Sequence, residues 1–128
     1  MAKLNIDCVR DILLAVEKRP YGEMWALDDI KEQLEAHQRE EIEYALLKLD
    51  EGRLLDVQLT QMLRQPISVA RIDDITYVGH EFLEHVRCEE NWNKIKNVSK
   101  KVGSTGIRTL LEISSGIITA AIKSQFEL

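Results

Sequence analysis

The sequence predicts an α+β fold that is mostly α-helical: three helices, a β-hairpin, a fourth helix and a C-terminal helical tail. Two observations predict this order. Apolar residues recur at three- and four-residue spacing over most of the 128 residues, which is the period of an amphipathic helix. Around residues 55–72 the spacing changes to two, which is the period of a half-buried strand.

The first helix is expected over residues 7–18. Asn5 or Asp7 can cap its N-terminus, and Pro20 with Gly22 ends it, because proline and glycine do not continue a helix. One face of this helix is apolar and consists of Ile6, Val9, Ile12, Leu13 and Val16.

Two further helices are expected before the hairpin. The second begins near Asp28, is capped by Asp28 or Asp29, and directs three residues inward: Leu27, Ile30 and Leu34. After a turn at His37, the third begins near Arg39 with an apolar stripe of Ile42, Ala45, Leu46 and Leu49. Gly52 follows where a residue with left-handed backbone commonly ends a helix.

The hairpin and the fourth helix come next. Alternation predicts a strand in which Leu55, Val57 and Leu59 face one side. Residues 60–66 are expected to form the loop, and residues 67–72 the returning strand. Thr76 then caps the fourth helix, whose inward face would consist of Val78, Phe82, Leu83 and Val86.

A hairpin placed directly after a third helix is the element order of winged-helix domains. The segment Ile75-Thr76-Tyr77-Val78-Gly79-His80-Glu81-Phe82-Leu83 resembles the L-T-x-x-G-x-x-x-L segment that follows the hairpin, or wing, in many of them. In that segment the threonine caps the helix and the glycine lets the helix pack closely. Residues 1–90 are therefore predicted to form a winged-helix-like body.

A longer resemblance covers most of the chain. It includes the opening Lys3-Leu4-Asn5-Ile6-Asp7-Cys8-Val9-Arg10-Asp11-Ile12-Leu13, the segment just quoted, and Trp92 followed by a lysine-rich helix. These features resemble domain-of-unknown-function family 2513, whose members are small, mostly uncharacterised proteins of bacteria, phages and prophages. The resemblance implies a mobile-element origin and a winged-helix-like body, and it implies no activity.

The charge changes sign along the chain. Residues 1–90 hold 11 basic and 20 acidic side chains, whereas residues 91–128 hold 6 basic and 2 acidic ones. This shift predicts a boundary near residue 90, between a body of residues 1–90 and a tail of residues 91–128. Within the tail, Gly103-Ser104-Thr105-Gly106 predicts a hinge near residues 103–106. The total charge of −5 excludes a wholly basic nucleic-acid coat.

The tail is expected to form two helical pieces. The first has an apolar stripe of Trp92, Ile95, Val98 and Val102. The second is apolar over so much of its circumference that it has to pack on the body, on a second copy or on a membrane surface. The anchors of an oligomer or partner interface would be Trp92, Ile107, Leu110, Leu111, Ile118 and Ile122.

No complete catalytic, metal-binding or cofactor motif occurs in the sequence, so we expect a non-enzymatic protein with no cofactor and no small-molecule substrate. The nearest candidate is His80-Glu81-Phe82-Leu83-Glu84-His85. Its two histidines lie five residues apart, which places them about 140° apart around a helix, so they cannot share one zinc ion. Glu81, His85 and Cys88 share a face that we expect to be solvated, with Cys88 partly buried. Cys8 is also expected to be buried.

DNA binding is the function that a winged-helix-like body suggests, with Arg39, Lys48, Arg64 and Arg71 as contacts. The third helix opposes it, because residues 39–51 carry a net charge of −3 that phosphates would repel. The lysines of the tail could bind phosphate weakly, or meet the acidic body of a neighbouring subunit, or only keep an apolar helix soluble. These are Lys94, Lys96, Lys100 and Lys101.

We therefore expect a phage- or prophage-type protein that acts through protein–protein interaction and self-associates through its C-terminal helix. The alternative is a DNA-binding winged-helix transcriptional regulator, and a third alternative is attachment to a membrane surface through the last helix. The sequence contains no recognisable secretion signal or transmembrane segment, so we expect the cytoplasm, where both thiols stay reduced.

Overall fold

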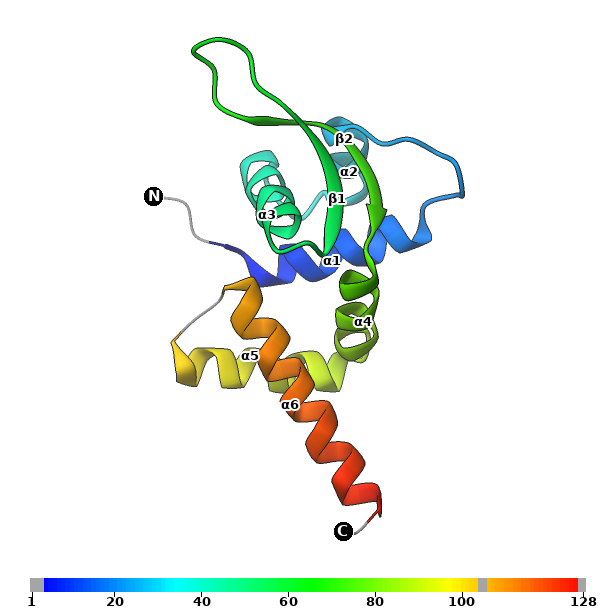
Figure 1. Cartoon of the computed structure of the whole chain (residues 1–128), viewed down its shortest axis with the longest axis vertical. Coiled ribbons are helices and arrows are strands. Elements are labelled where there is room, and N and C mark those ends of the chain that lie inside the picture. Colours follow the sequence, from blue (N-terminus) through cyan, green and yellow to red (C-terminus); the bar gives the residue numbers. More distant parts are fainter. Residues whose placement is uncertain (1–3, 104–105, 127–128) are drawn as a thin grey trace. The chain divides into compact units, whose positions relative to one another are not determined.

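The structure is a computed structural model that describes residues 4–103 and 106–126 (Figure 1). The described residues form six helices and one two-stranded antiparallel hairpin, which confirms the predicted α+β, mostly helical fold. In chain order the elements are α1 (Ile6–Lys18), α2 (Leu27–Gln33), α3 (Arg39–Glu51), β1 (Leu55–Thr60), β2 (Ser68–Ile75), α4 (Tyr77–Val86), α5 (Glu89–Val102) and α6 (Ile107–Phe126).

The chain divides into two compact units, unit 1 (Met1–His80) and unit 2 (Glu81–Leu128). The boundary near residue 90 was inferred from charge and stays a prediction. Of the hinge predicted at residues 103–106, residues 104 and 105 lie outside the described residues. Gly103, with φ of 81°, adopts the left-handed conformation that ends α5.

Helix α1 follows its prediction closely. The Asn5 side chain caps it by accepting hydrogen bonds from the backbone N–H groups of Asp7 and Cys8. The apolar face forms a large part of the core of unit 1, with Cys8, Val9, Ile12, Leu13 and Val16 buried, while Ile6 is half-buried.

Helix α2 begins one residue earlier than predicted, so neither Asp28 nor Asp29 is its N-cap. Ala26 occupies that position, and its backbone N–H donates to Oδ2 of Asp29 over 2.8 Å. Asp29 therefore stabilises the N-terminus from inside the first turn, where a carboxylate also meets the positive end of the helix dipole. The inward residues are as predicted: Leu27, Ile30 and Leu34 are buried.

The end of α3 corrects the prediction for Gly52, which has right-handed backbone with φ of −78°. The left-handed residue is Arg53, with φ of 63°. The backbone N–H of Leu54 donates to the carbonyl of Leu49 (2.9 Å), and that of Arg53 to the carbonyl of Asp50 (3.1 Å), which is a Schellman motif. Leu49 and Leu54 are both buried, so the turn is fixed by their packing although its left-handed position holds an arginine.

The hairpin is less regular than the alternating sequence predicts. Strand β2 runs to Ile75, three residues beyond the predicted end, and its pairing with β1 shifts twice. Because of these shifts the alternation of β1 fails at its far end, and Leu59 is exposed whereas Leu55 and Val57 are buried. The register is Leu55–Ile75, Val57–Ile72, Gln58–Arg71, Leu59–Val69 and Thr60–Ser68.

Contacts from the segment after α1 hold the irregular part of β2. The guanidinium of Arg19 donates hydrogen bonds to the carbonyls of Ile72 (2.9 Å) and Asp73. The same guanidinium lies 5.8 Å from the ring centre of Trp25, and the Trp25 carbonyl accepts a hydrogen bond from the Ile72 N–H over 2.8 Å. These contacts satisfy backbone groups that the irregular ladder leaves without a strand partner.

Helix α4 begins as predicted, with the Thr76 hydroxyl accepting a hydrogen bond from the Gly79 N–H over 3.0 Å. At Gly79 the helix lies so close to the end of α3 that a Cβ atom would stand 2.0 Å from the carbonyl oxygen of Leu54. Gly79 is therefore the buried residue of this turn. The prediction that Val78 faces inward is wrong, because Val78 is exposed. The rest of the predicted face, Phe82, Leu83 and Val86, is buried.

In unit 2, α5 packs against α6. The buried residues of α5 are Trp92, Ile95 and Ser99, so the predicted stripe is wrong at Val98 and Val102, which are exposed. The helical period places position 99 on the same face as positions 92 and 95, and the small side chain of Ser99 lies there. Facing it, α6 buries Leu110 and Ser114.

The close approach at Gly79 yields a test of stability. We expect Gly79→Ala to lower the free energy of unfolding by at least about 2 kcal/mol, because the added methyl overlaps backbone that cannot move easily. Gly116→Ala is the matched control, since a Cβ at Gly116 in α6 meets nothing within 4 Å. That variant should gain about 0.5–1 kcal/mol. Urea unfolding checks both, and equal effects of the two substitutions would contradict the close approach.

The left-handed residue after α3 yields a second test. We expect Arg53→Gly to be about 1 kcal/mol more stable than Arg53→Ala, because only the glycine has no Cβ to strain at φ of 63°. Both variants remove the same charge, so their difference isolates the backbone. Thermal unfolding measures it, and an alanine variant as stable as the glycine variant would rule out strain at this position.

Candidate interaction surfaces

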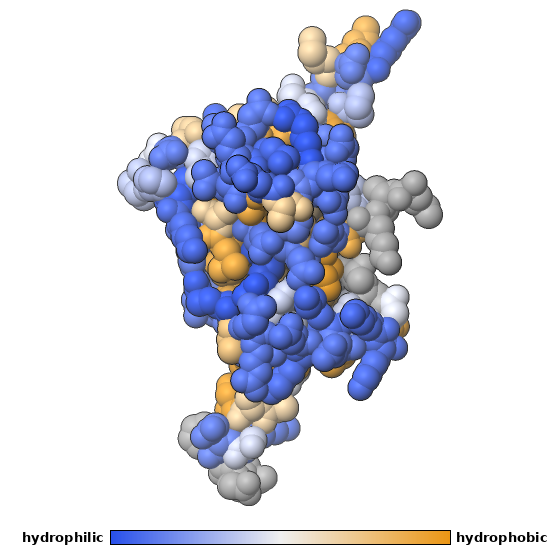
Figure 2. All heavy atoms as spheres, turned by 180° about the vertical axis from the view of Figure 1, so that it is seen from behind, coloured by the Kyte–Doolittle hydropathy of each residue, from blue (hydrophilic) through white to orange (hydrophobic). Residues whose placement is uncertain are grey.

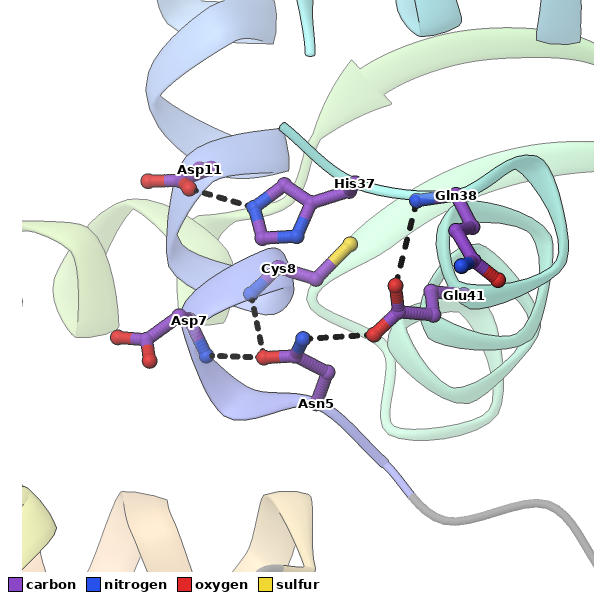
Figure 3. Close-up of polar contacts among 7 residues, drawn as sticks. All are labelled: Asn5, Asp7, Cys8, Asp11, His37, Gln38 and Glu41. Carbon is purple, nitrogen blue, oxygen red and sulfur yellow. Dashed lines mark hydrogen bonds and ion pairs between the residues drawn. The ribbon is translucent and has the colours of Figure 1, made fainter. Parts of the chain in front are cut away.

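Polar contacts join the N-terminal ends of α1 and α3 (Figure 3). While Oδ1 of Asn5 caps α1 through the N–H groups of Asp7 (3.1 Å) and Cys8 (3.2 Å), its Nδ2 donates to Oε2 of Glu41 over 2.8 Å. Oε1 of Glu41 accepts a hydrogen bond over 3.2 Å from the backbone N–H of Gln38, which is the N-cap residue of α3. One amide and one carboxylate therefore cap two helices and join them.

A cysteine, a histidine and an aspartate lie close to this junction (Figure 3), but they do not form a nucleophilic centre. Nε2 of His37 lies 2.8 Å from Oδ2 of Asp11, which joins the segment before α3 to α1. Burial, and to a smaller extent the charges of Glu41 and Asp11, raise the pKa of the Cys8 thiol to about 12. Cys8 thus stays protonated and buried, as predicted for a core residue.

The outer face of α3 combines an apolar centre with acidic residues. We define it as Glu40, Glu43, Tyr44 and Leu47, which recur at helical spacing and are exposed or half-buried. The ammonium of Lys48 lies 5.4 Å from the ring centre of Tyr44 and 2.8 Å from Oε2 of Glu51. Lys48 is therefore already paired with an acid, and no ion pair to Glu40 or Glu43 occurs among the described residues.

Three of the four cations predicted to contact DNA are paired with carboxylates of their own unit. Arg39 binds Asp28, Lys48 binds Glu51, and Nε of Arg71 lies 2.8 Å from Oδ1 of Asp73. The hydrogen bonds of Asp73 with Arg71 and then Gln58 hold the pKa of that carboxyl below its usual value. Phosphate contacts through these cations would require the pairs to separate. The DNA-contact residues stay a prediction.

The fourth cation, Arg64, lies in the hairpin tip, which we define as Met62, Leu63 and Arg64. The turn is closed by the Gln65 N–H, which donates to the Met62 carbonyl over 3.0 Å, and by the Gln61 side chain, which donates to the Gln65 carbonyl over 3.2 Å. Leu63 is 90% exposed and Met62 72%. Figure 2 shows apolar and hydrophilic residues side by side where the hairpin loop ends, at the upper right.

The turn residues of this segment predict only a loop, and the periodicity of the sequence does not predict its apolar surface. A hollow of about 410 Å³ is lined by Thr60, Met62, Leu63, Gln65, Pro66 and Ser68. The signal was present in the sequence: residues 57–70 contain one charged side chain, Arg64, in a chain that is 30% charged. A loop with so little charge and with exposed apolar residues is unusual on a protein surface.

The predicted interface residues of the tail differ in exposure. Trp92 and Leu110 are buried within the chain, whereas Ile107, Leu111 and Ile118 are half-buried and Ile122 is 52% exposed. Apolar surface is visible over the C-terminal half of α6 at the lower end of Figure 2. Neither α6 nor any other described helix is long and apolar enough to cross a membrane. The interface itself stays a prediction.

Among the described residues, no group of three or more His, Cys, Asp or Glu side chains could hold a metal ion, so neither the histidines nor Cys88 belong to such a group. Nδ1 of His85 lies 3.4 Å from the hydroxyl of Ser114, and that hydroxyl donates to the Leu111 carbonyl over 3.0 Å. Cys88 is exposed, which corrects the expectation of partial burial, because it precedes α5 as its N-cap residue.

The fold and these surfaces describe a small, mostly helical α+β protein with exposed apolar residues at the hairpin tip and along α6. A comparison with family models matches residues 3–105 to the family described as a hypothetical protein (DUF2513). The match spans most of the chain, so the chain belongs to this family, as its resemblance indicated. No curated protein and no solved structure matches the chain.

The junction of α1 and α3 yields a pH prediction. The hydrogen bonds from Asn5 and then from the Gln38 N–H hold the pKa of Glu41 below its ordinary value of 4.5. The stability that this carboxylate contributes is therefore present above the ordinary value and is lost as the pH falls below it through the lower pKa of the folded state. We expect Glu41→Gln to show a smaller loss of stability than the wild type between about pH 6 and pH 3.

Glu40→Gln is the matched control, because it removes the same charge from the same turn of α3 without touching Asn5. Thermal unfolding across this pH range measures the three proteins. If the Glu41→Gln and Glu40→Gln profiles coincide, the carboxylate of Glu41 is not what couples the two helices to pH.

Proposed function

We propose that this chain is a non-enzymatic protein of phage or prophage type, with a winged-helix-like body, that acts by binding protein and self-associates through α6. One observation carries the proposal. The inner face of α6 is buried in its first half, at Leu110 and Ser114, and the same face is uncovered in its second half, where Ile118 is half-buried and Ile122 is 52% exposed.

The uncovered residues form one stripe. Leu111, Ile118 and Ile122 are spaced seven and four residues apart, so they lie within about 40° of one another around the helix. Two of the charged residues of α6, Arg108 and Glu112, are 3.9 Å apart in the N-terminal part of the helix, before Ile118 and Ile122. Such a stripe would lose its contact with water only against another apolar surface.

A second copy of the chain is the occupant that the charges favour. The chain carries a net charge of −5, so most pairs of its surfaces repel each other. The stripe itself is uncharged, and two copies would present it to each other around a two-fold axis. Burying an isoleucine stabilises such a contact by about 1.5–3 kcal/mol. DNA binding receives less support, because Arg39, Lys48 and Arg71 are already paired with carboxylates.

Molar mass in solution tests the proposal. Light scattering on the full chain should give a mass above the 14.7 kDa of one copy, and Ile122→Asp should lower that mass at equal protein concentration, because it removes the α6 contact. Ser124→Asp is the matched control, because it places the same charge on an exposed residue two positions away, about 160° around α6 from Ile122. It should leave the oligomer intact.

A wild-type chain that stays a monomer at every concentration would refute the proposal. So would an oligomer whose mass Ile122→Asp and Ser124→Asp change equally. Ile122 suits this test better than Leu111, because it is the more exposed of the two and its substitution leaves the packing between α5 and α6 in place.

A further inference from the structure

Two unfavourable features coincide at the hairpin tip. Arg64 has φ of 63°, a conformation that residues with a side chain rarely adopt, and no ion pair to it occurs among the described residues. Its neighbours Leu63 and Met62 are 90% and 72% exposed, although both are large and apolar. Backbone strain and exposed apolar side chains in the same turn do not stabilise unit 1. Together they indicate a surface that contacts a binding partner.

The charge of the hairpin differs from that of the unit that carries it. Residues 1–80 contain 10 basic and 16 acidic side chains, whereas residues 57–70 contain Arg64 and no acidic residue. A partner for the tip would therefore offer apolar atoms for Leu63 and Met62, with a carboxylate beside them for the guanidinium of Arg64.

The outer face of α3 has this chemistry. Tyr44 and Leu47 form its apolar centre, and both are half-buried. Glu40 and Glu43 lie beside them on the same helix face, without an ion pair to a basic residue among the described residues. The face belongs to unit 1, as the hairpin does, so every copy of the chain carries both surfaces.

We propose that the hairpin tip of one copy docks on the outer face of α3 of a second copy, with Leu63 against Tyr44 and Leu47, and Arg64 against Glu43. A two-fold axis makes the contact reciprocal, because the second copy's hairpin meets the first copy's α3 in the same way. Two small contacts then form together, and each becomes effectively intramolecular once the other has formed.

Charge selects a second copy over nucleic acid as the occupant. A duplex lying along the hairpin would bring phosphates to the neighbouring α3, where Glu40 and Glu43 would repel them. The outer face of α3 on a second copy is acidic and apolar, so its charge is opposite to that of Arg64 and attracts the hairpin tip. The contact rests on the proposed function only in that both involve self-association, and it uses neither α6 nor any other part of unit 2.

The experiment is carried out in the full chain with Ile122→Asp, so that the α6 contact is removed from both partners. Sedimentation velocity over a range of protein concentrations should still detect a reversible dimer. Arg64→Glu and Glu43→Arg should each weaken this dimer at least about tenfold, because each places like charges together. The double variant Arg64→Glu with Glu43→Arg should restore the dissociation constant to within about threefold, because the swapped pair attracts again.

Two controls change the same charges elsewhere on unit 1. Lys18→Glu and Glu35→Arg lie in a groove of about 590 Å³ whose lining includes neither the tip nor the outer face of α3. They should leave the dimer within about twofold of the background. Leu63→Ser, which removes the apolar contact without changing the charge, should weaken the dimer as the single charge reversals do.

The outcomes separate this contact from the one through α6. Loss of the dimer with Ile122→Asp alone would overturn the hairpin contact and leave the α6 contact supported. A dimer that the charge swap does not restore would also overturn it. Fluorescence anisotropy with mixed-sequence duplex DNA covers the other occupant: binding that depends on Arg64 and Leu63 but not on Glu43 would replace the second copy with nucleic acid.

Discussion

The arrangement of unit 1 depends on the backbone of one residue, Leu54. Its N–H closes the turn after α3 by donating to the Leu49 carbonyl (2.9 Å), and its own carbonyl accepts from the Thr76 N–H (3.0 Å). Gly79 lies directly against that carbonyl, where no larger residue fits. The end of α3, the start of β1 and the start of α4 therefore meet at a single peptide group. Any residue but glycine at position 79 would push the first turn of α4 away from Leu54.

The opposite end of α3 is fixed by a polar contact of different character. There Asn5 and Glu41 cap two helices at once, and both partners remain partly accessible, so water and protons can compete with their hydrogen bond. The two ends of α3 thus differ: a steric constraint holds the C-terminal end under all conditions, and a charged hydrogen bond holds the N-terminal end only while Glu41 is ionised. The acidic outer face of α3 is presented by a helix anchored at both ends.

Most of the fold followed from the sequence because its helices are amphipathic and separated by turn residues, so periodicity and those residues locate them to within a few positions. The errors share a cause. Arg53 takes the left-handed position beside a glycine, and Gly79 replaces Val78 on the buried face, because neighbouring elements decide which residue fits. The spacing of apolar residues within one helix carries no information about those neighbouring elements. The exposure of Ile122 and of the hairpin tip depended likewise on where α5 and the strand pairing end, although the sparse charge of residues 57–70 was a usable signal.

Acidity restricts which exposed apolar residues of this chain can meet a second copy. With 10 basic and 16 acidic side chains in residues 1–80, two such units repel each other, and salt reduces this repulsion beyond about 8 Å without removing it at contact distance. An interface is favoured where charge is nearly absent, as along the stripe of α6, or where opposite charges meet, as in the contact proposed between Arg64 and Glu43. The acidic residues that disfavour phosphate contacts on α3 therefore also restrict which surfaces of two copies can come together. An apolar patch elsewhere on this body would stay exposed, because the surrounding carboxylates would hold a second copy away.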